Sequence, residues 1–172
     1  MKPNRIYFIN SILLIIAAFT FIIYAHDDGQ KGRTKKTDYN QGCTCHGDNP
    51  DPSVSVVISG PDTLKADMEA TYTVKISGGP LKAAGTDIAV SKGKLSPNDK
   101  DLKLMSGELT HTEPKKPQGD FVMFIFTYKA PLTAGTETIY ANGNSVNGND
   151  KKTGDKWNFA KDKKVVIVRS KE

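Results

Sequence analysis

The residues best suited to chemistry stand together near the N-terminus. Cys43, Cys45 and His46 fall within four positions, in a polar segment that holds both cysteines of the chain and one of its three histidines. Thiols and imidazoles are ligands for soft metals and for haem iron, and a chain of 172 residues does not need them to fold. The order Cys-Thr-Cys-His is one residue shorter than the Cys-x-x-Cys-His motif of c-type haem attachment. The segment therefore indicates a covalent haem, a metal ion or a redox pair of thiols.

The shortened spacing decides how a haem would be attached. In the usual motif the two thiols are three positions apart, but here Gly42 occupies the position three before Cys45. We therefore expect haem c to be held through one thioether at Cys45, with His46 as an axial ligand of the iron. Cys43 is then free, or attached through a distorted backbone. Gly42 and Gly47 flank the segment and permit unusual backbone angles beside a flat macrocycle.

A six-coordinate haem needs a second axial ligand, and His111 is the expected one. It lies in the run Leu-Thr-His-Thr at 109–112, inside a stretch with a folded pattern. Met68, Met105 and Met123 are weaker candidates, and a methionine ligand would raise the reduction potential. Two axial ligands close the iron to substrates, so the sequence predicts an electron carrier with a redox partner protein rather than an enzyme.

Three other interpretations of the cysteine cluster stay open. Cys43 and Cys45 could form a disulfide in an oxidising compartment, but a ring closed over one residue is strained and reducible. Both thiolates with His46 and His111 could form a site for copper or zinc. In the third interpretation the two cysteines are free, or are joined between molecules and tie the N-terminal segment to a partner. The protein is then a cofactor-free surface module that binds a protein or a glycan.

The N-terminus predicts export. Lys2 and Arg5 precede a nearly unbroken apolar stretch at 6–25, which is typical of a secretory signal. The same segment, 1–25, is long enough to stay as a membrane anchor. Residues 26–41 are charged and have few apolar side chains, which predicts a flexible linker. The rest would be periplasmic, on the outer surface or extracellular, with membrane contact only through the N-terminal segment.

Charge and motifs exclude several function classes. The formal net charge is +5, but the lysines are scattered in pairs and do not alternate with aromatic residues, so nucleic-acid binding is not indicated. The chain contains no glycine-rich phosphate loop, no nucleophile elbow and no pair of carboxylates framed by apolar residues. Hydrolytic and phosphoryl-transfer chemistry is therefore not indicated either.

The elements that must position the cysteines and histidines are strands. Apolar residues alternate with period two at 54–58 and 72–76, and the strongest run is 121–128. Shorter runs stand at 88–90, 102–104, 109–111, 136–141 and 164–168. Beyond the N-terminal segment, which is expected to be helical, no stretch carries the apolar stripe of a helix. The pattern predicts one all-β domain over 42–170, an antiparallel β-sandwich of seven or eight strands.

A second polar cluster lies at 142–150, where asparagines and glycines alternate. Its oxygen-rich side chains suit calcium, but the spacing differs from that of the twelve-residue calcium loop and no glutamate closes it. Asn-Gly pairs also favour tight turns, and we expect turns here rather than calcium binding. We expect Trp157 and Phe159, just beyond this cluster, to lie in the core.

Motifs along the domain resemble a known family. They are the Gly-Cys-Thr-Cys-His-Gly run at 42–47, Ser-Gly-Pro at 59–61, Ser-Gly-Gly at 77–79, Leu-Thr-His-Thr at 109–112 and the Asn-Gly-rich run at 140–149. This succession resembles the bacterial secreted domain called choice-of-anchor V, which is similar to the reeler domain of animal extracellular proteins. The resemblance covers 42–168 and implies an exported, immunoglobulin-like or reeler-like sandwich. Where members carry Cys-x-x-Cys-His, it also implies covalent haem, from which this chain departs by one residue.

Overall fold

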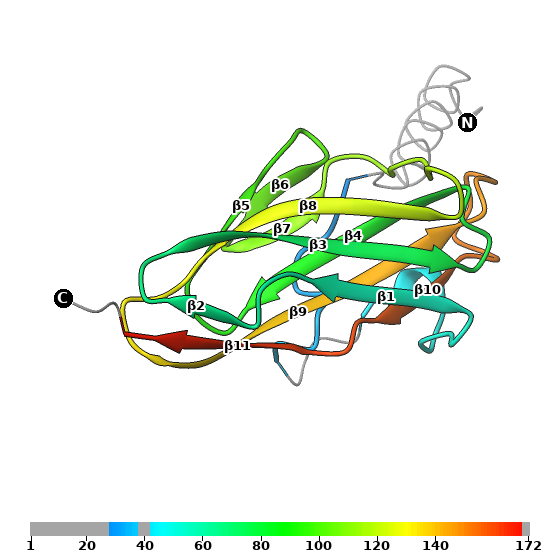
Figure 1. Cartoon of the computed structure of the whole chain (residues 1–172). Coiled ribbons are helices and arrows are strands. Elements are labelled where there is room, and N and C mark those ends of the chain that lie inside the picture. The colour runs from blue at the N-terminus through cyan, green and yellow to red at the C-terminus, as the bar shows by residue number, and fades with distance from the viewer. Residues whose placement is uncertain (1–27, 38–41, 170–172) are drawn as a thin grey trace, which may run out of the picture.

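The computed structural model describes residues 28–37 and 42–169, so the expected signal or anchor segment at 1–25 lies outside the described residues. Within the described residues, two β-sheets pack face to face (Figure 1). The predicted all-β sandwich is therefore confirmed. None of the described residues forms a helix long and apolar enough to cross a membrane.

The smaller sheet has four strands in the order β1-β3-β8-β5. Its strands are β1 (Val54–Ser59), β3 (Glu69–Gly78), β8 (Phe121–Lys129) and β5 (Lys94–Pro97). The larger sheet has seven strands in the order β2-β11-β9-β4-β7-β6, with β10 added to β9. Its strands are β2 (Thr63–Lys65), β11 (Lys163–Val168), β9 (Gly135–Val146), β4 (Ala83–Val90), β7 (Glu108–His111), β6 (Leu102–Met105) and β10 (Lys156–Phe159). A single 3-10 turn, η1 (Thr44–His46), is the one helical element among the described residues.

The strand count exceeds the seven or eight predicted, because β2, β5 and β10 have only three or four residues each. The β2–β11 pair is parallel, whereas the other pairs are antiparallel. The turn expected at 142–144 is wrong, since these residues lie inside the long strand β9, and the loop begins only after Val146.

The core fills the space between the sheets and follows the alternation seen in the sequence. In β1, residues 54, 56 and 58 are buried while 55, 57 and 59 are exposed. Tyr72 of β3 lies at the centre, with its ring 5.9 Å from the rings of both Phe126 and Tyr128. All three rings are fully buried. Burial of such a side chain stabilises the fold by roughly 1.5–3 kcal/mol, so this aromatic cluster is a main source of sandwich stability.

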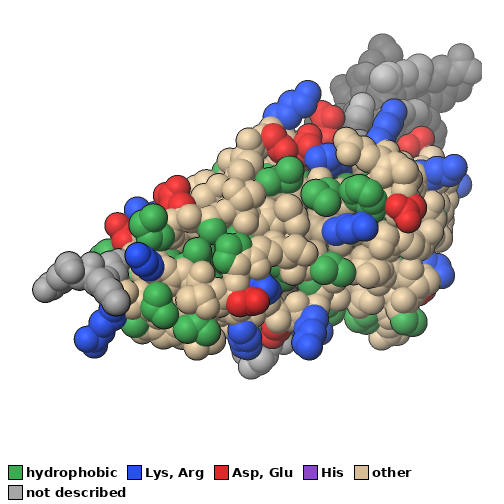
Figure 2. All heavy atoms as spheres, viewed as in Figure 1, with side chains coloured by type: hydrophobic (Ala, Val, Ile, Leu, Met, Phe, Trp, Pro, Cys, Tyr) green, Lys and Arg blue, Asp and Glu red, His purple; other side chains and the backbone are tan. Residues whose placement is uncertain are grey.

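The outer face of the smaller sheet is solvent-exposed. Figure 2 shows this side of the molecule with its hydrophobic groups in small separate patches between polar and charged side chains. Val57, for example, is 47% exposed on this face of β1. Neither described histidine is visible from this side. The described cysteines and histidines lie on the side of the larger sheet instead.

The outer face of the larger sheet is polar but covered. Ala84, Ile88 and Val90 of β4 are buried in the core, but Asp87 and Ala89, which alternate with them and face outward, are buried too, because other parts of the chain lie over this face. One cover is residues 28–37, which we call the N-terminal strap. The other is residues 42–47, which we call the Cys-His turn and which contains η1. The candidate site lies between these covers and the sheet.

Candidate functional site

The predicted cysteines and histidines line one cleft of about 660 Å³ on the outer face of the larger sheet. Cys43, Cys45 and His46 come from the Cys-His turn, and His111 comes from the end of β7. The floor is made by β4 and β9, and the walls by the strap and the 147–155 loop. Further lining residues are Arg33, Lys82, Gly85, Thr86, Asp87, Pro114, Lys116, Asn142, Asn144, Asn149, Asp150, Lys151, Lys152 and Asp155.

Trp157 anchors the Cys-His turn to the sheet. Its indole N–H donates to the carbonyl of Gly47 at 2.7 Å. Gly42 lies directly on the indole ring, since a Cβ at this position would come within 2.1 Å of a ring carbon. Gly42 also has a φ of +73°, which favours glycine. Trp157 is buried as expected, but under the turn rather than between the sheets. Phe159, also expected in the core, is only partly buried and makes a T-shaped contact with the Trp157 ring.

His46 is oriented by a carboxylate. Its Nδ1 lies 2.7 Å from Oδ2 of Asp155, whose side chain is only 3% exposed. The other oxygen of Asp155 accepts the backbone N–H of Asn147 at 2.9 Å. Histidines that bind metals commonly donate one ring N–H to a carboxylate in this way. The arrangement holds the imidazole in one orientation and leaves Nε2 for a ligand.

His111 is held through the same ring atom, but by backbone. Its Nδ1 lies 3.1 Å from both the N–H and the carbonyl of Thr86. The ring covers Gly85, where a Cβ would come within 2.5 to 2.9 Å of three ring atoms. Burial lowers the pKa of His111, which favours the neutral imidazole that can bind a metal. As in His46, Nε2 is the nitrogen that is left.

The two thiols differ in environment. Burial raises the pKa of Cys43 to about 12, and the nearby Asp87 adds to this effect. Cys43 therefore stays protonated, which makes it a poor nucleophile and a poor metal ligand. Cys45 is solvent-exposed, and both cysteines are free thiols. Only Cys45 has the access that covalent attachment of a cofactor requires.

The N-terminal strap lies against the sheet rather than free in solvent, unlike the flexible linker expected for 26–41. Consecutive backbone N–H groups of Gly32 and Arg33 donate to the carboxylates of Glu108 and Asp87, each at 2.6 Å. The carbonyl of Arg33 accepts from the side-chain amide of Asn142, also at 2.6 Å. The strap has few apolar residues, so hydrogen bonds to the sheet take the place of hydrophobic burial.

Polar side chains beneath the strap were not predicted as site residues. Asp87 and Asn144 are 1% and 7% exposed, and one oxygen of each has no hydrogen-bond partner among the described residues. Asp87 directly precedes the apolar run at 88–90. A single carboxylate next to such a run could have marked Asp87 as a candidate site residue in the sequence. Asn144 was assigned to a turn, which hid its place on the floor of the cleft.

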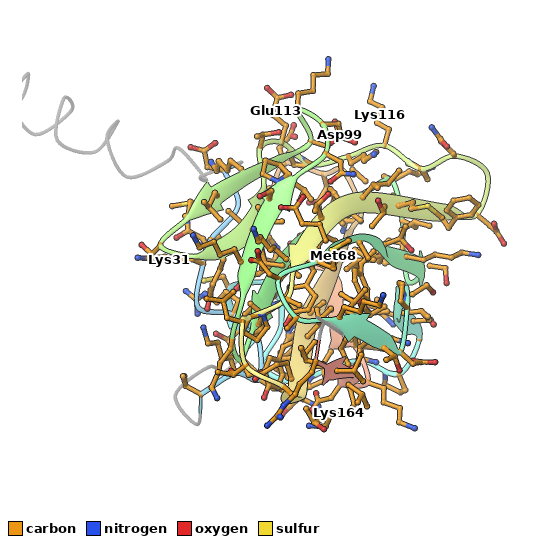
Figure 3. The ribbon with its side chains drawn as sticks, turned by 60° about the vertical axis from the view of Figure 1, so that its left-hand side comes forward. Lys31, Met68, Asp99, Glu113, Lys116 and Lys164 are labelled. Atoms are coloured by element: carbon orange, nitrogen blue, oxygen red, sulfur yellow. The ribbon has the colours of Figure 1, made fainter. Side chains whose placement is uncertain are left out.

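Lysines surround the mouth of the cleft. Lys82, Lys116, Lys151 and Lys152 line it, and in the described part of the chain none of the four makes an ion pair. Figure 3 shows Lys116 projecting away from the body of the sandwich. The mouth is thus suited to an anionic group on a bound molecule.

The remaining predicted ligands are not at the cleft. Met68, Met105 and Met123 are absent from its lining, and Met68 is 55% exposed. Within residues 28–37 and 42–169, no three side chains among His, Cys, Asp and Glu are arranged to hold a metal ion. A copper or zinc site built from both thiolates and both imidazoles would therefore need these side chains to move together.

Comparisons with known proteins do not identify a family. No family model matches the chain, and no curated protein matches it. Among solved structures it is similar to Escherichia coli alpha-2-macroglobulin activated by porcine elastase, with 14% sequence identity and a TM-score of 0.40. The matched region covers 68% of this chain and 9% of that one. A similarity at this level assigns no activity.

Proposed function

We propose that this protein is an exported one-electron carrier that holds haem in the cleft. Haem would be attached through one thioether at Cys45, with His46 and His111 as axial ligands. The observation that carries the proposal is that both imidazoles line one cleft, each with Nδ1 engaged and Nε2 left over. Bound haem supplies reversible one-electron chemistry, and two imidazole ligands leave no position for a substrate. The protein would then serve a redox partner rather than convert a substrate.

The donor set suits haem better than a bare metal ion. A porphyrin supplies four of the six iron ligands, so the protein needs to bring only one or two side chains into place. Zinc or copper(I) would need three or four convergent protein ligands, and no three side chains among His, Cys, Asp and Glu converge in this way within the described residues. The cleft volume of about 660 Å³ is within the usual range for cofactor sites. The unpaired lysines at its mouth suit the two carboxylates of a haem.

The compartment and the family belong to the same proposal. The basic and apolar N-terminus supports export, and the order of motifs supports membership of choice-of-anchor V proteins. Attachment of haem to a thiol of an exported chain is consistent with both. An exposed thiol of this kind would also have to avoid disulfide formation in an oxidising compartment, which a thioether achieves.

The test is to express the full chain in a bacterium that makes c-type cytochromes and to record its absorption spectrum. We expect a red protein whose Soret band survives extraction with acidified acetone. Cys45→Ala should lose the covalent haem, so that the extracted protein is colourless. The matched variant Cys43→Ala should keep it, because burial raises the pKa of the Cys43 thiol and keeps it protonated.

Two further results would decide between alternatives. His111→Ala should keep the thioether but change the spectrum from low-spin to high-spin, because one axial ligand is lost. Equal loss of haem from both cysteine variants would mean two thioethers instead of one. A colourless wild-type protein under these conditions would overturn the proposal and leave the cofactor-free binding module.

A further inference from the structure

The lysines at the mouth of the cleft carry positive charge that the fold does not neutralise. They are Lys82, Lys116, Lys151 and Lys152, which we call the lysine rim, and all four are exposed. Within the described residues, none of the four makes an ion pair or a cation–π contact. Six other lysines of the described chain are each paired with a carboxylate.

The fold brings three separate segments together at the lysine rim. Lys82 directly precedes β4, and its N–H donates to the carbonyl of the last residue of β9 at 2.8 Å. On the other side of β4, Lys115 exchanges two backbone hydrogen bonds of 2.9 Å with the second residue of that strand, which places the next lysine beside it. The stem of Lys82 lies against the 147–155 loop, because a Cβ on Gly148 would come within 3.3 Å of it. This loop carries the other two lysines, so all four gather at one end of the cleft.

The carboxylates that line the cleft do not balance the lysine rim. Asp28 is paired with a lysine of β6, and Asp155 is bonded to an imidazole. Asp87 is buried under the strap. Asp150 is therefore the one lining carboxylate in the described chain that is both exposed and unpaired. The two carboxylates of a bound haem would neutralise two more charges and still leave the rim positive on balance.

The side chains at the mouth favour a protein partner over a nucleic acid. None of the described residues that line the cleft is a phenylalanine, tyrosine or tryptophan, so a base would find no aromatic ring on which to stack. Phosphate groups are best held by the planar fork of an arginine, whereas lysines act as flexible point charges. Point charges distributed around an opening suit an extended acidic surface, which they attract from a distance and orient.

We propose that the lysine rim is the docking surface for an acidic face of the redox partner protein. This inference rests on the proposed function, since the partner must approach the haem through the open mouth of the cleft. A reduced partner loses one electron to the haem iron, which goes from ferric to ferrous, and no bond forms or breaks. Interfaces of this kind are small and weak, so charge rather than buried area governs the encounter.

The test measures how fast an acidic redox protein reduces the haem-loaded full chain. The probe is reduced plant-type ferredoxin, a small acidic protein of low potential, and the small cation hexaammineruthenium(II) is the comparison. The ferredoxin rate constant should fall about tenfold as salt rises from about 20 mM to about 500 mM, because salt screens the attraction. The rate constant for the ruthenium cation should rise over the same range, since the rim repels it.

Variants with reversed charge assign the effect to the rim. At low salt, Lys151→Glu combined with Lys152→Glu should lower the ferredoxin rate constant about tenfold and raise that of the ruthenium cation. Misfolding or loss of haem would instead lower both. The matched control is Lys65→Glu combined with Lys94→Glu, which makes the same change in net charge on exposed lysines outside the cleft lining. It should keep both rate constants close to those of the wild type.

The outcomes separate this inference from the proposed function. A ferredoxin rate constant that does not depend on salt, or that falls equally in the two double variants, rules out docking at the rim. A colourless chain contradicts the proposed function instead, and titration calorimetry of that chain with the same ferredoxin at low salt then tests the rim alone. Binding that is present in the wild type and lost in Lys151→Glu with Lys152→Glu supports the docking surface, and its absence from the wild type rejects it.

Discussion

Asp87 shows how burial of a single residue can control stability. Burial raises the pKa of this carboxyl from 3.8 to about 7, and the like charge of Glu108 also raises it, while the N–H of Arg33 opposes the change. The same hydrogen bond ties the strap to the sheet. Ionisation of Asp87 therefore places a buried negative charge beside Glu108, and it removes the proton of the hydrogen bond between the two side chains.

We predict that the wild-type protein loses stability as the pH rises from about 4 to about 7. In this window the folded protein keeps a proton that the unfolded chain has released, so the free energy of unfolding falls with pH. The slope is at most about 1.4 kcal/mol per pH unit. Urea unfolding at a series of pH values should show this fall in wild type and in Asp150→Asn. Asp87→Asn should lack it, and parallel curves for all three proteins would contradict the assignment.

At the scale of elements, the Cys-His turn depends on another part of the chain. Its 3-10 turn has three residues and closes with one backbone hydrogen bond, from His46 N–H to the carbonyl of Cys43. So short a segment has no stability of its own. It is held from outside by Trp157 beneath it and by Asp155 beside it, both from the β10 end of the larger sheet.

We predict that Gly42→Ala detaches the turn from Trp157. The new Cβ would overlap the indole ring, in addition to the strain of a positive φ. The emission maximum of Trp157 should shift to longer wavelength as the ring becomes exposed. Gly119→Ala is the matched control, because Gly119 has a φ of +67° but nothing within 4 Å of its Cβ position. Gly119→Ala should lower the free energy of unfolding by about 1 kcal/mol and leave the emission maximum unchanged. If Gly42→Ala also leaves the emission maximum unchanged, the contact of Gly42 with Trp157 does not hold the turn in place.

The strands and the chemical residues were predictable to different degrees. Strands with one buried face, such as β1 and β3, follow directly from alternation in the sequence. β9 was only half predicted, because Asn142 and Asn144 are polar although they are buried on the covered face of the sheet. Cys45, His46 and His111 could be chosen as candidate cofactor ligands from the sequence, because thiols and imidazoles bind haem iron and soft metals. Their partners, including Asp155 at 109 positions from His46, depend on tertiary contacts that no local pattern contains.

At the scale of the whole molecule, the site and the sandwich are one structure. The strap is bonded to β4, β7 and β9 through Asp87, Glu108 and Asn142. The Cys-His turn is bonded to β10, which extends the same sheet through β9. Neither cover can leave without exposing polar groups on the sheet that it satisfies. The described chain is therefore expected to unfold as one cooperative unit.

We predict coincident unfolding by two probes that report on different places. Far-ultraviolet circular dichroism reports on the strands of both sheets. The emission of Trp157 reports on the contact between this residue and the Cys-His turn. The two urea transitions should have the same midpoint within error. A tryptophan transition at clearly lower urea would mean that the covers detach first and that the site opens separately from the sandwich.

The long separation between the Cys-His turn and its supports has a consequence for biogenesis. Synthesis proceeds from the N-terminus, so Cys45 and His46 are made about 110 residues before Asp155 and Trp157 exist to receive them. While the chain is being made, the Cys-His turn therefore lacks both of these supports. Under the proposed function, an enzyme that attaches haem to Cys45 would meet its target before the supports exist, and the last strands would then fold around the attached haem.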